Sequence, residues 1–126
     1  MNYILVFIGG GVGSSLRHSI NLASARWLGT AFPYHTFIIN ITGSMVMGLI
    51  AGYLAFRGEA SPHWRLFLMT GILGGYTTFS SFSLDAMNLI SQKSYGYFAL
   101  YVLGSVLLSL LGTWIGLIAA RALAGG

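Results

Sequence analysis

The chain has 126 residues and a net charge of +4, and it is 56% hydrophobic but only 6% charged. Soluble domains are about a quarter charged, so this composition excludes an ordinary soluble globular domain, and the length fits one small domain, residues 1–126. There is no cysteine, which excludes disulfides and thiol catalysis, and the six Lys and Arg are scattered, which excludes the basic patch of a nucleic-acid-binding protein.

Long apolar stretches predict four membrane-crossing helices, because such a helix needs about 20 mostly apolar residues. The first begins close to the N-terminus, where MNYILVFIGGG lacks the basic segment of a cleaved signal peptide. Three short polar turns, GTAFPYH, RGEASPH and SQKSYG, separate the helices. The expected fold class is an all-α membrane protein with four transmembrane helices per subunit, at about 3–28, 36–56, 64–89 and 97–123.

Each predicted span contains two glycines four residues apart. Glycines at this spacing share one helix face and let two backbones approach closely. We therefore expect a compact helical bundle, although glycine is common in membrane helices and some pairs arise by chance. The pairs are Gly9 and Gly13, Gly48 and Gly52, Gly71 and Gly75, and Gly112 and Gly116.

The basic residues are balanced between the two ends of the predicted bundle. Arg57, Arg65 and Arg121 fall at one end, and Arg17, Arg26 and Lys93 fall toward the other. Membrane proteins normally place Lys and Arg on the cytoplasmic side, so this balance predicts insertion in both orientations and an antiparallel homodimer. The alternative is that one ambiguous charge sets a single orientation.

Polar residues form two stripes within the second and fourth spans. Residues four apart are neighbours on one helix face, and polar side chains in lipid usually face the bundle interior or a water-filled path. The alternatives are that single hydroxyls bond back to their own helix and that Asn40 joins two helices. The stripes are Thr36, Asn40 and Ser44, and Tyr101, Ser105, Ser109 and Thr113.

The third span contains GGYTTFSSFS, where the two glycines Gly74 and Gly75 make a break in the helix possible. Backbone exposed at membrane depth is tolerated only when it is buried in protein or lines a cavity. Phe79 and Phe82 are three residues apart, so both rings share a face if the helix resumes there. Hydroxyl residues surround the two rings. A broken helix exposes carbonyls, which suit a cation, and amides, which suit an anion. The alternative is that the two phenylalanines face lipid or the core.

The residues favour a small anion as the permeating species. The stripes offer O–H and N–H donors, and phenyl rings carry a positive edge. Arg17 and the net positive charge attract anions. No stripe contains a carboxylate, which a cation pathway normally has.

These motifs resemble the fluoride channels of the CrcB/Fluc family over nearly the whole chain. GGGVGSSLR, which ends at Arg17, is similar to the family's glycine-rich first helix, and TFIINITGSMVMG is similar to its second helix. GGYTTFSSFSLD resembles its signature in a broken third helix. The resemblance implies a dual-topology dimer with two pores, which exports fluoride passively through the bacterial inner membrane.

The resemblance also implies roles for single residues and a central structural sodium ion. Here Ser81 replaces the usual threonine, Asp85 replaces the usual glutamate and His18 replaces a common aromatic. Arg17 matches the family's arginine and is expected to attract anions to the mouth of the pore. The implied sodium ligands are the carbonyls of Gly74 and Thr77, and the implied fluoride pathway contains Asn40, Phe79, Phe82, Ser80, Ser81, Tyr101, Ser105 and Ser109.

Two other functions fit the composition less well. A small multidrug exporter also has four spans and dual topology, but it needs a carboxylate in the first span, whereas the acidic residues here are Glu59 and Asp85. A membrane scaffold would conduct no ion. An enzyme is not expected, because the three histidines lie apart in the sequence and no nucleophile–base motif is present.

Overall fold

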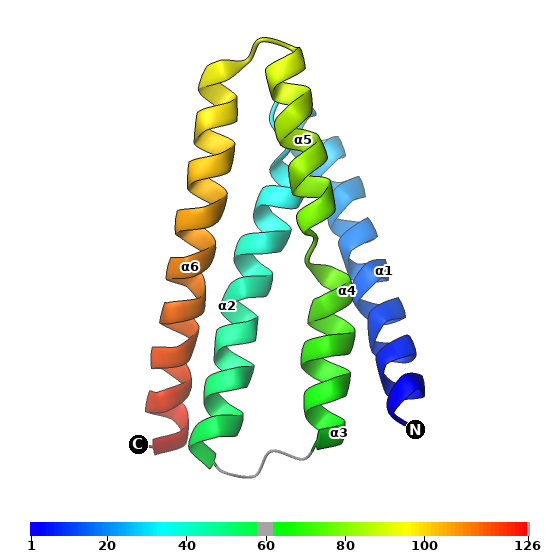
Figure 1. The fold of residues 1–126 in the computed structure, drawn as a ribbon, viewed down its shortest axis with the longest axis vertical. Coiled ribbons are helices and arrows are strands. Elements are labelled where there is room, and N and C mark those ends of the chain that lie inside the picture. Colours follow the sequence, from blue (N-terminus) through cyan, green and yellow to red (C-terminus); the bar gives the residue numbers. More distant parts are fainter. Residues whose placement is uncertain (58–61, 126) are drawn as a thin grey trace.

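The computed structural model describes residues 1–57 and 62–125, and each regular element in these ranges is a helix. The turn RGEASPH, with Glu59, falls mostly outside the described residues. Figure 1 shows the helices side by side in one elongated bundle. In chain order they are α1 (Asn2–Leu28), α2 (Tyr34–Arg57), α3 (Pro62–Arg65), the π-helix η1 (Leu66–Leu73), α4 (Gly74–Tyr76), α5 (Phe79–Ser91) and α6 (Tyr95–Gly125).

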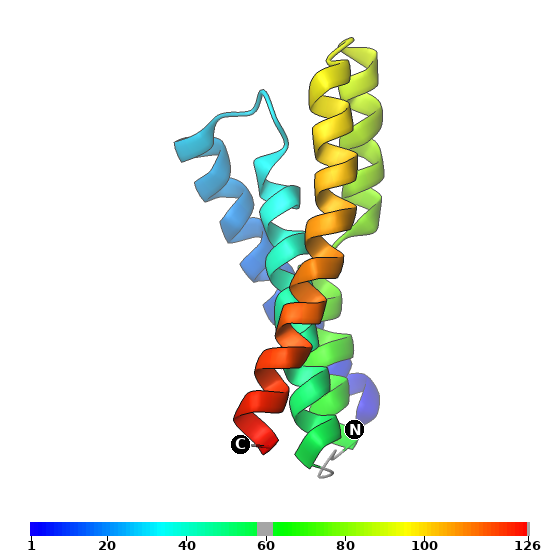
Figure 2. The same ribbon diagram turned by 90° about the vertical axis from the view of Figure 1, so that its left-hand side faces the viewer.

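Successive long segments of the chain run in alternating directions, so the termini and the turns fall at the two ends of the bundle. Both termini and the start of α3 lie at one end, and the turns from α1 to α2 and from α5 to α6 lie at the other (Figure 1). The C-terminal half of α1 leans away from α5 and α6 (Figure 2). Two helices among the described residues are long and apolar enough to cross a membrane, and they cover Tyr34–Ala55 and Tyr95–Gly125.

The paired glycines lie where helices touch. A Cβ atom added to Gly9 would lie 2.7 Å from the carbonyl oxygen of Phe67 in η1, and one added to Gly116 would lie 2.8 Å from the amide nitrogen of Leu49 in α2. A Cβ on Gly48 would collide with the backbone of Thr113 in α6. The predicted close approach of backbones is therefore confirmed for the contact of α1 with η1 and for that of α2 with α6.

The third helix breaks, but three residues later than its glycines suggest. Gly74 is helical, with φ −62° and ψ −37°, whereas Thr77 (φ −82°, ψ 156°) and Thr78 (φ −152°, ψ 122°) are extended. Gly75 instead serves packing, because an added Cβ would lie 3.0 Å from the Cα of Gly10. The expected break of the third helix is therefore confirmed, and it falls at Thr77 and Thr78 instead of at the two glycines.

Candidate functional site

An open groove of about 390 Å³ runs beside the helix break. Its walls come from α2, from the break with the first turn of α5, and from α6. The two polar stripes therefore face a common space, except for Thr36 and Tyr101 at their first positions, and they meet the broken segment there. The lining residues are Asn40, Gly43, Ser44, Met47, Thr77, Thr78, Phe79, Phe82, Ser105, Val106, Ser109, Leu110 and Thr113.

Asn40 holds the broken segment in place. Its Nδ2 donates to the carbonyl oxygen of Thr78 at 2.9 Å, and its Oδ1 accepts the amide N–H of Thr78, also at 2.9 Å. These two bonds replace the helical bonds that an extended Thr78 loses. Because an amide nitrogen carries two hydrogens, Asn40 keeps one further N–H, and its position in the groove lining gives that donor access to the groove.

The helix break leaves two backbone carbonyls without the amide donors that a continuous helix would give them. In a continuous α-helix, the carbonyls of Gly74 and Thr77 would accept from the amides of Thr78 and Ser81. Here the Thr78 amide bonds to Asn40, and the Ser81 amide donates to Thr78 Oγ1 at 3.2 Å, which caps α5. The oxygens of Gly74 and Thr77 are therefore free to accept from, or coordinate, something else.

Phe79 and Phe82 occupy the first turn of α5 and both line the groove. Their ring centroids are 5.4 Å apart with an interplanar angle of 41°, so the prediction that the rings share a face is confirmed. The Phe79 side chain is 77% exposed in the protomer. An aromatic ring this open, next to a helix break, is available to an ion or to another subunit.

The α6 side of the groove presents hydroxyl groups at one-turn intervals. Ser105 is only 5% exposed, and its Oγ has no hydrogen-bond partner within the described residues. Leaving a buried hydroxyl unpaired costs about 1–3 kcal/mol. Thr113, in contrast, donates to the carbonyl of Ser44 at 3.0 Å and ties α6 to α2. Ser109 also lines the groove, so Ser105 and Ser109 are the hydroxyls best placed to meet a ligand.

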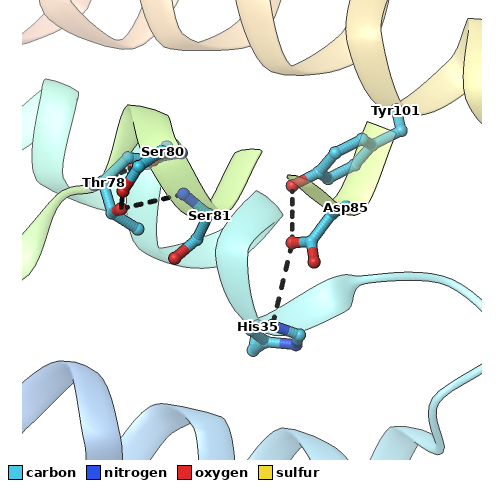
Figure 3. Close-up of polar contacts among 7 residues, drawn as sticks. His35, Thr78, Ser80, Ser81, Asp85 and Tyr101 are labelled. Atoms are coloured by element: carbon cyan, nitrogen blue, oxygen red, sulfur yellow. Dashed lines mark hydrogen bonds and ion pairs between the residues drawn. The ribbon is translucent and has the colours of Figure 1, made fainter. Parts of the chain in front are cut away.

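Several residues singled out from the sequence lie outside this groove lining. Tyr101 is fully buried among aromatic rings, and its hydroxyl donates to Asp85 Oδ2 at 3.1 Å. The Ser80 hydroxyl lies 3.2 Å from that of Thr78, beside the start of α5 (Figure 3). The lining also lacks Gly74, Ser81 and Arg17, among the residues that the structure describes.

The pairing of Asn40 with Thr78 is a feature that the sequence pattern does not reveal. A second is His35, whose Nε2 lies 3.9 Å from Asp85 Oδ2 (Figure 3). His35 is 50 residues from Asp85 in the sequence, and neither belongs to a polar stripe. Only the fold brings the two side chains together.

The family model described as "CrcB-like protein, Camphor Resistance (CrcB)" matches residues 4–117. The chain belongs to the CrcB family. The groove and the helix break both lie within the part of the chain that matches this model. Together with the apolar helices, membership of the CrcB family identifies the chain as a membrane protein.

Other members of the CrcB family are closely similar over almost their full length. A protein of Rhodopseudomonas palustris (strain BisB5), named fluoride-specific ion channel FluC, is 64% identical over 123 residues, which cover 98% of this chain and 99% of that protein. The fluoride-specific ion channel FluC 2 of Nitrobacter hamburgensis is 59% identical and covers 96% and 98% of the two chains. A FluC protein of Methylobacterium nodulans is 52% identical, with coverage of 96% and 97%.

Proposed function

We propose that this protein is a fluoride-selective ion channel that lets fluoride leave the bacterial cytoplasm passively through the inner membrane. The observation that carries the proposal is the 64% identity to a protein named as a fluoride-specific ion channel, over nearly the full length of both chains. Fluoride enters cells as neutral HF and is trapped as the anion in a more alkaline cytoplasm. A channel lowers that concentration without covalent chemistry, so no enzymatic activity is proposed.

The lining of the groove suits a small anion. Asn40, Ser105 and Ser109 offer N–H and O–H donors, and Phe79 and Phe82 offer ring edges with a positive potential. No carboxylate lines the groove in the described parts of the chain. The unpaired Ser105 hydroxyl, in the wall of the groove, is one donor that no protein acceptor occupies among the described residues.

We further propose an antiparallel homodimer with two pores, in which a second subunit closes each groove. The balance of basic residues between the two ends supports this arrangement, because neither orientation in the membrane is favoured. The surroundings of Gly74 give independent support to the dimer. A Cβ atom at this position would meet only the Met69 carbonyl, at the ordinary contact distance of 3.6 Å, so packing within the protomer gives no reason for glycine. Close approach of a partner subunit provides one.

A structural sodium ion is proposed where the two subunits meet. The free carbonyl oxygens of Gly74 and Thr77 fit such an ion, since unwound backbone carbonyls coordinate sodium in membrane proteins. A bound ion would supply positive charge that holds the two broken helices together. Each protomer contributes two carbonyls, so the complete site requires the dimer.

The direct test of the channel is ion efflux from liposomes that contain the purified protein. We expect fluoride to leave these vesicles rapidly while chloride is retained, measured with ion-selective electrodes against protein-free vesicles. Equal passage of both halides, or of neither, would contradict the proposal. Proton-coupled efflux of a cationic drug from the same vesicles would favour the multidrug exporter instead.

The Gly74→Ala variant tests the dimer and its ion. We expect unchanged helical content by circular dichroism, because the protomer has room for the methyl group. The dimer fraction of the variant should fall. In the wild type, we expect that replacing sodium by a large organic cation alters the dimer fraction, whereas in the variant the same replacement should have no effect. Light scattering in detergent measures the mass. Gly96→Ala is the matched control, since nothing lies within 4 Å of that position either and Gly96 lies at the start of α6, at the end of the bundle and away from the helix break. Equal dimer fractions in both variants would reject the role of Gly74.

A further inference from the structure

A small polar pocket lies at the end of the bundle where α1 turns into α2 and α5 turns into α6. Its volume is about 120 Å³. Asp85 from α5 and His35 from the start of α2 face each other there, and their side chains are 19% and 36% exposed. Figure 3 shows Asp85 between the hydroxyl of Tyr101 and the ring of His35. The pocket is lined by Thr30, Ala31, Phe32, Pro33, His35, Asp85, Asn88, Leu89 and Gln92.

Asp85 supplies the single carboxylate side chain of the described residues. It accepts one hydrogen bond, from Tyr101 at 3.1 Å, whereas the 3.9 Å distance to His35 Nε2 is longer than a hydrogen bond. With a neutral His35, the negative charge of Asp85 therefore has no cationic partner in contact among the residues that the structure describes. A protonated His35 would provide that partner, because both ring nitrogens then carry hydrogens.

This carboxylate is close to the proposed path of the anion. The Tyr101 ring, whose hydroxyl binds Asp85, stacks against the Phe82 ring with centroids 5.2 Å apart, and Phe82 lines the groove. Tyr101 also lies one helical turn before Ser105 on α6. One layer of aromatic rings thus separates the charge of Asp85 from the groove. An uncompensated negative charge at that distance opposes the passage of an anion.

We propose that His35 is a proton-sensitive regulator of the channel, which increases anion flow when its protonation neutralises Asp85. This inference rests on the proposed function. Histidine is the side chain that changes charge between about pH 5 and 8. The pair would then raise fluoride flow as the solution becomes acidic, which is the condition under which neutral HF forms and enters.

Asp85 is the charged group that faces His35, so a positive charge on His35 would act on this carboxylate. Asp85 faces His35 from α5, and Tyr101 reaches that carboxylate from α6. The remaining polar side chains of the pocket are uncharged: Thr30, Asn88 and Gln92. In the described ranges, α1 contributes no lining residue, and its last basic residue, Arg26, stacks over Trp27.

The test is the fluoride current through single channels in a planar bilayer, recorded in symmetrical solutions between pH 6 and pH 8. Current is the appropriate measure because neutral HF carries none. Equal pH on both sides makes the result independent of orientation. We expect the current to be roughly two- to fivefold larger at pH 6, the effect of one screened elementary charge several ångströms from an ion. A pH-independent wild-type current would overturn the inference while leaving the channel itself intact.

Three variants make the result specific. His35→Gln should give a current that stays at the wild-type pH 8 level at both pH values, and His35→Lys should give the higher current at both. Asp85→Asn should remove the pH dependence even if His35→Gln fails to assemble. His63→Gln is the matched control, because His63 is an exposed histidine on α3 at the other end of the bundle. Persistence of the pH dependence in His35→Gln or in Asp85→Asn, or its loss in His63→Gln, would overturn the assignment.

Discussion

Replacing Asn40 with aspartate is expected to abolish fluoride current. The substitution keeps one oxygen that can accept the Thr78 amide, but the second oxygen would face the Thr78 carbonyl in place of the Nδ2 donor. Two acceptors then oppose each other at a contact of 2.9 Å in the native chain. The lost pairing costs about 1–3 kcal/mol, and the added negative charge stands in the proposed path of the anion. Both effects act in the same direction.

Single-channel recording and liposome efflux measure this effect. Circular dichroism and light scattering should show that the variant retains its helices and assembles. Asn2→Asp is the matched control, because Asn2 is an exposed asparagine at the start of α1 and lies outside both the groove lining and the pocket of Asp85. Wild-type current through a well-assembled Asn40→Asp variant would remove Asn40 from the proposed pathway. A similar loss in Asn2→Asp would assign the effect to charge alone.

Replacing Phe79 or Phe82 with isoleucine is expected to reduce fluoride efflux at least about tenfold, which corresponds to about 1.4 kcal/mol. Isoleucine keeps an apolar side chain of moderate size but has no ring edge with positive potential. The fold should tolerate the change at Phe79, whose side chain is 77% exposed in the protomer. The change at Phe82 also removes its contact with Tyr101, so its assembly needs a separate check.

A second exposed phenylalanine provides the comparison. Phe7 on α1 is 82% exposed and lies outside the groove lining, so Phe7→Ile should conduct like the wild type. Efflux of fluoride per assembled channel is the quantity to compare among the three variants. Undiminished efflux in both Phe79→Ile and Phe82→Ile would exclude the ring edges as an ion site. Loss of efflux only in the variant that fails to assemble would point to packing instead.

The helices and their glycine contacts could be predicted from sequence because both depend on short, regular spacings. A glycine pair such as Gly9 and Gly13 marks one helix face whatever lies opposite. The polar stripes could be predicted for the same reason, and residues from both, including Asn40 and Ser105, line the groove. The spacing of residues along the sequence specifies which face of a helix they share. In a bundle of few helices, such a face has few neighbours against which it can pack.

The position of the break and the pocket at His35 could not be predicted, because each depends on contacts between distant segments. Thr78 leaves the helix where Asn40, 38 residues earlier, takes both of its backbone groups. A propensity argument assigns the break to Gly74 and Gly75, which remain helical. His35 and Asp85 likewise share no periodic pattern, so their contact follows only from how α2 and α5 are placed.

The contact of α2 with α6 through Gly48 and Gly116 has a mechanical consequence. Glycine has no side-chain torsion, so this seam loses no rotamer entropy on packing, and no side chain at these two positions can swing aside. The two helices that carry Asn40 and Ser105 are thus joined as a stiff pair, with spacing fixed by main-chain atoms. A contact of this kind keeps the distance between α2 and α6 nearly constant. Selectivity among ions can then depend on a width of the passage that thermal motion changes little.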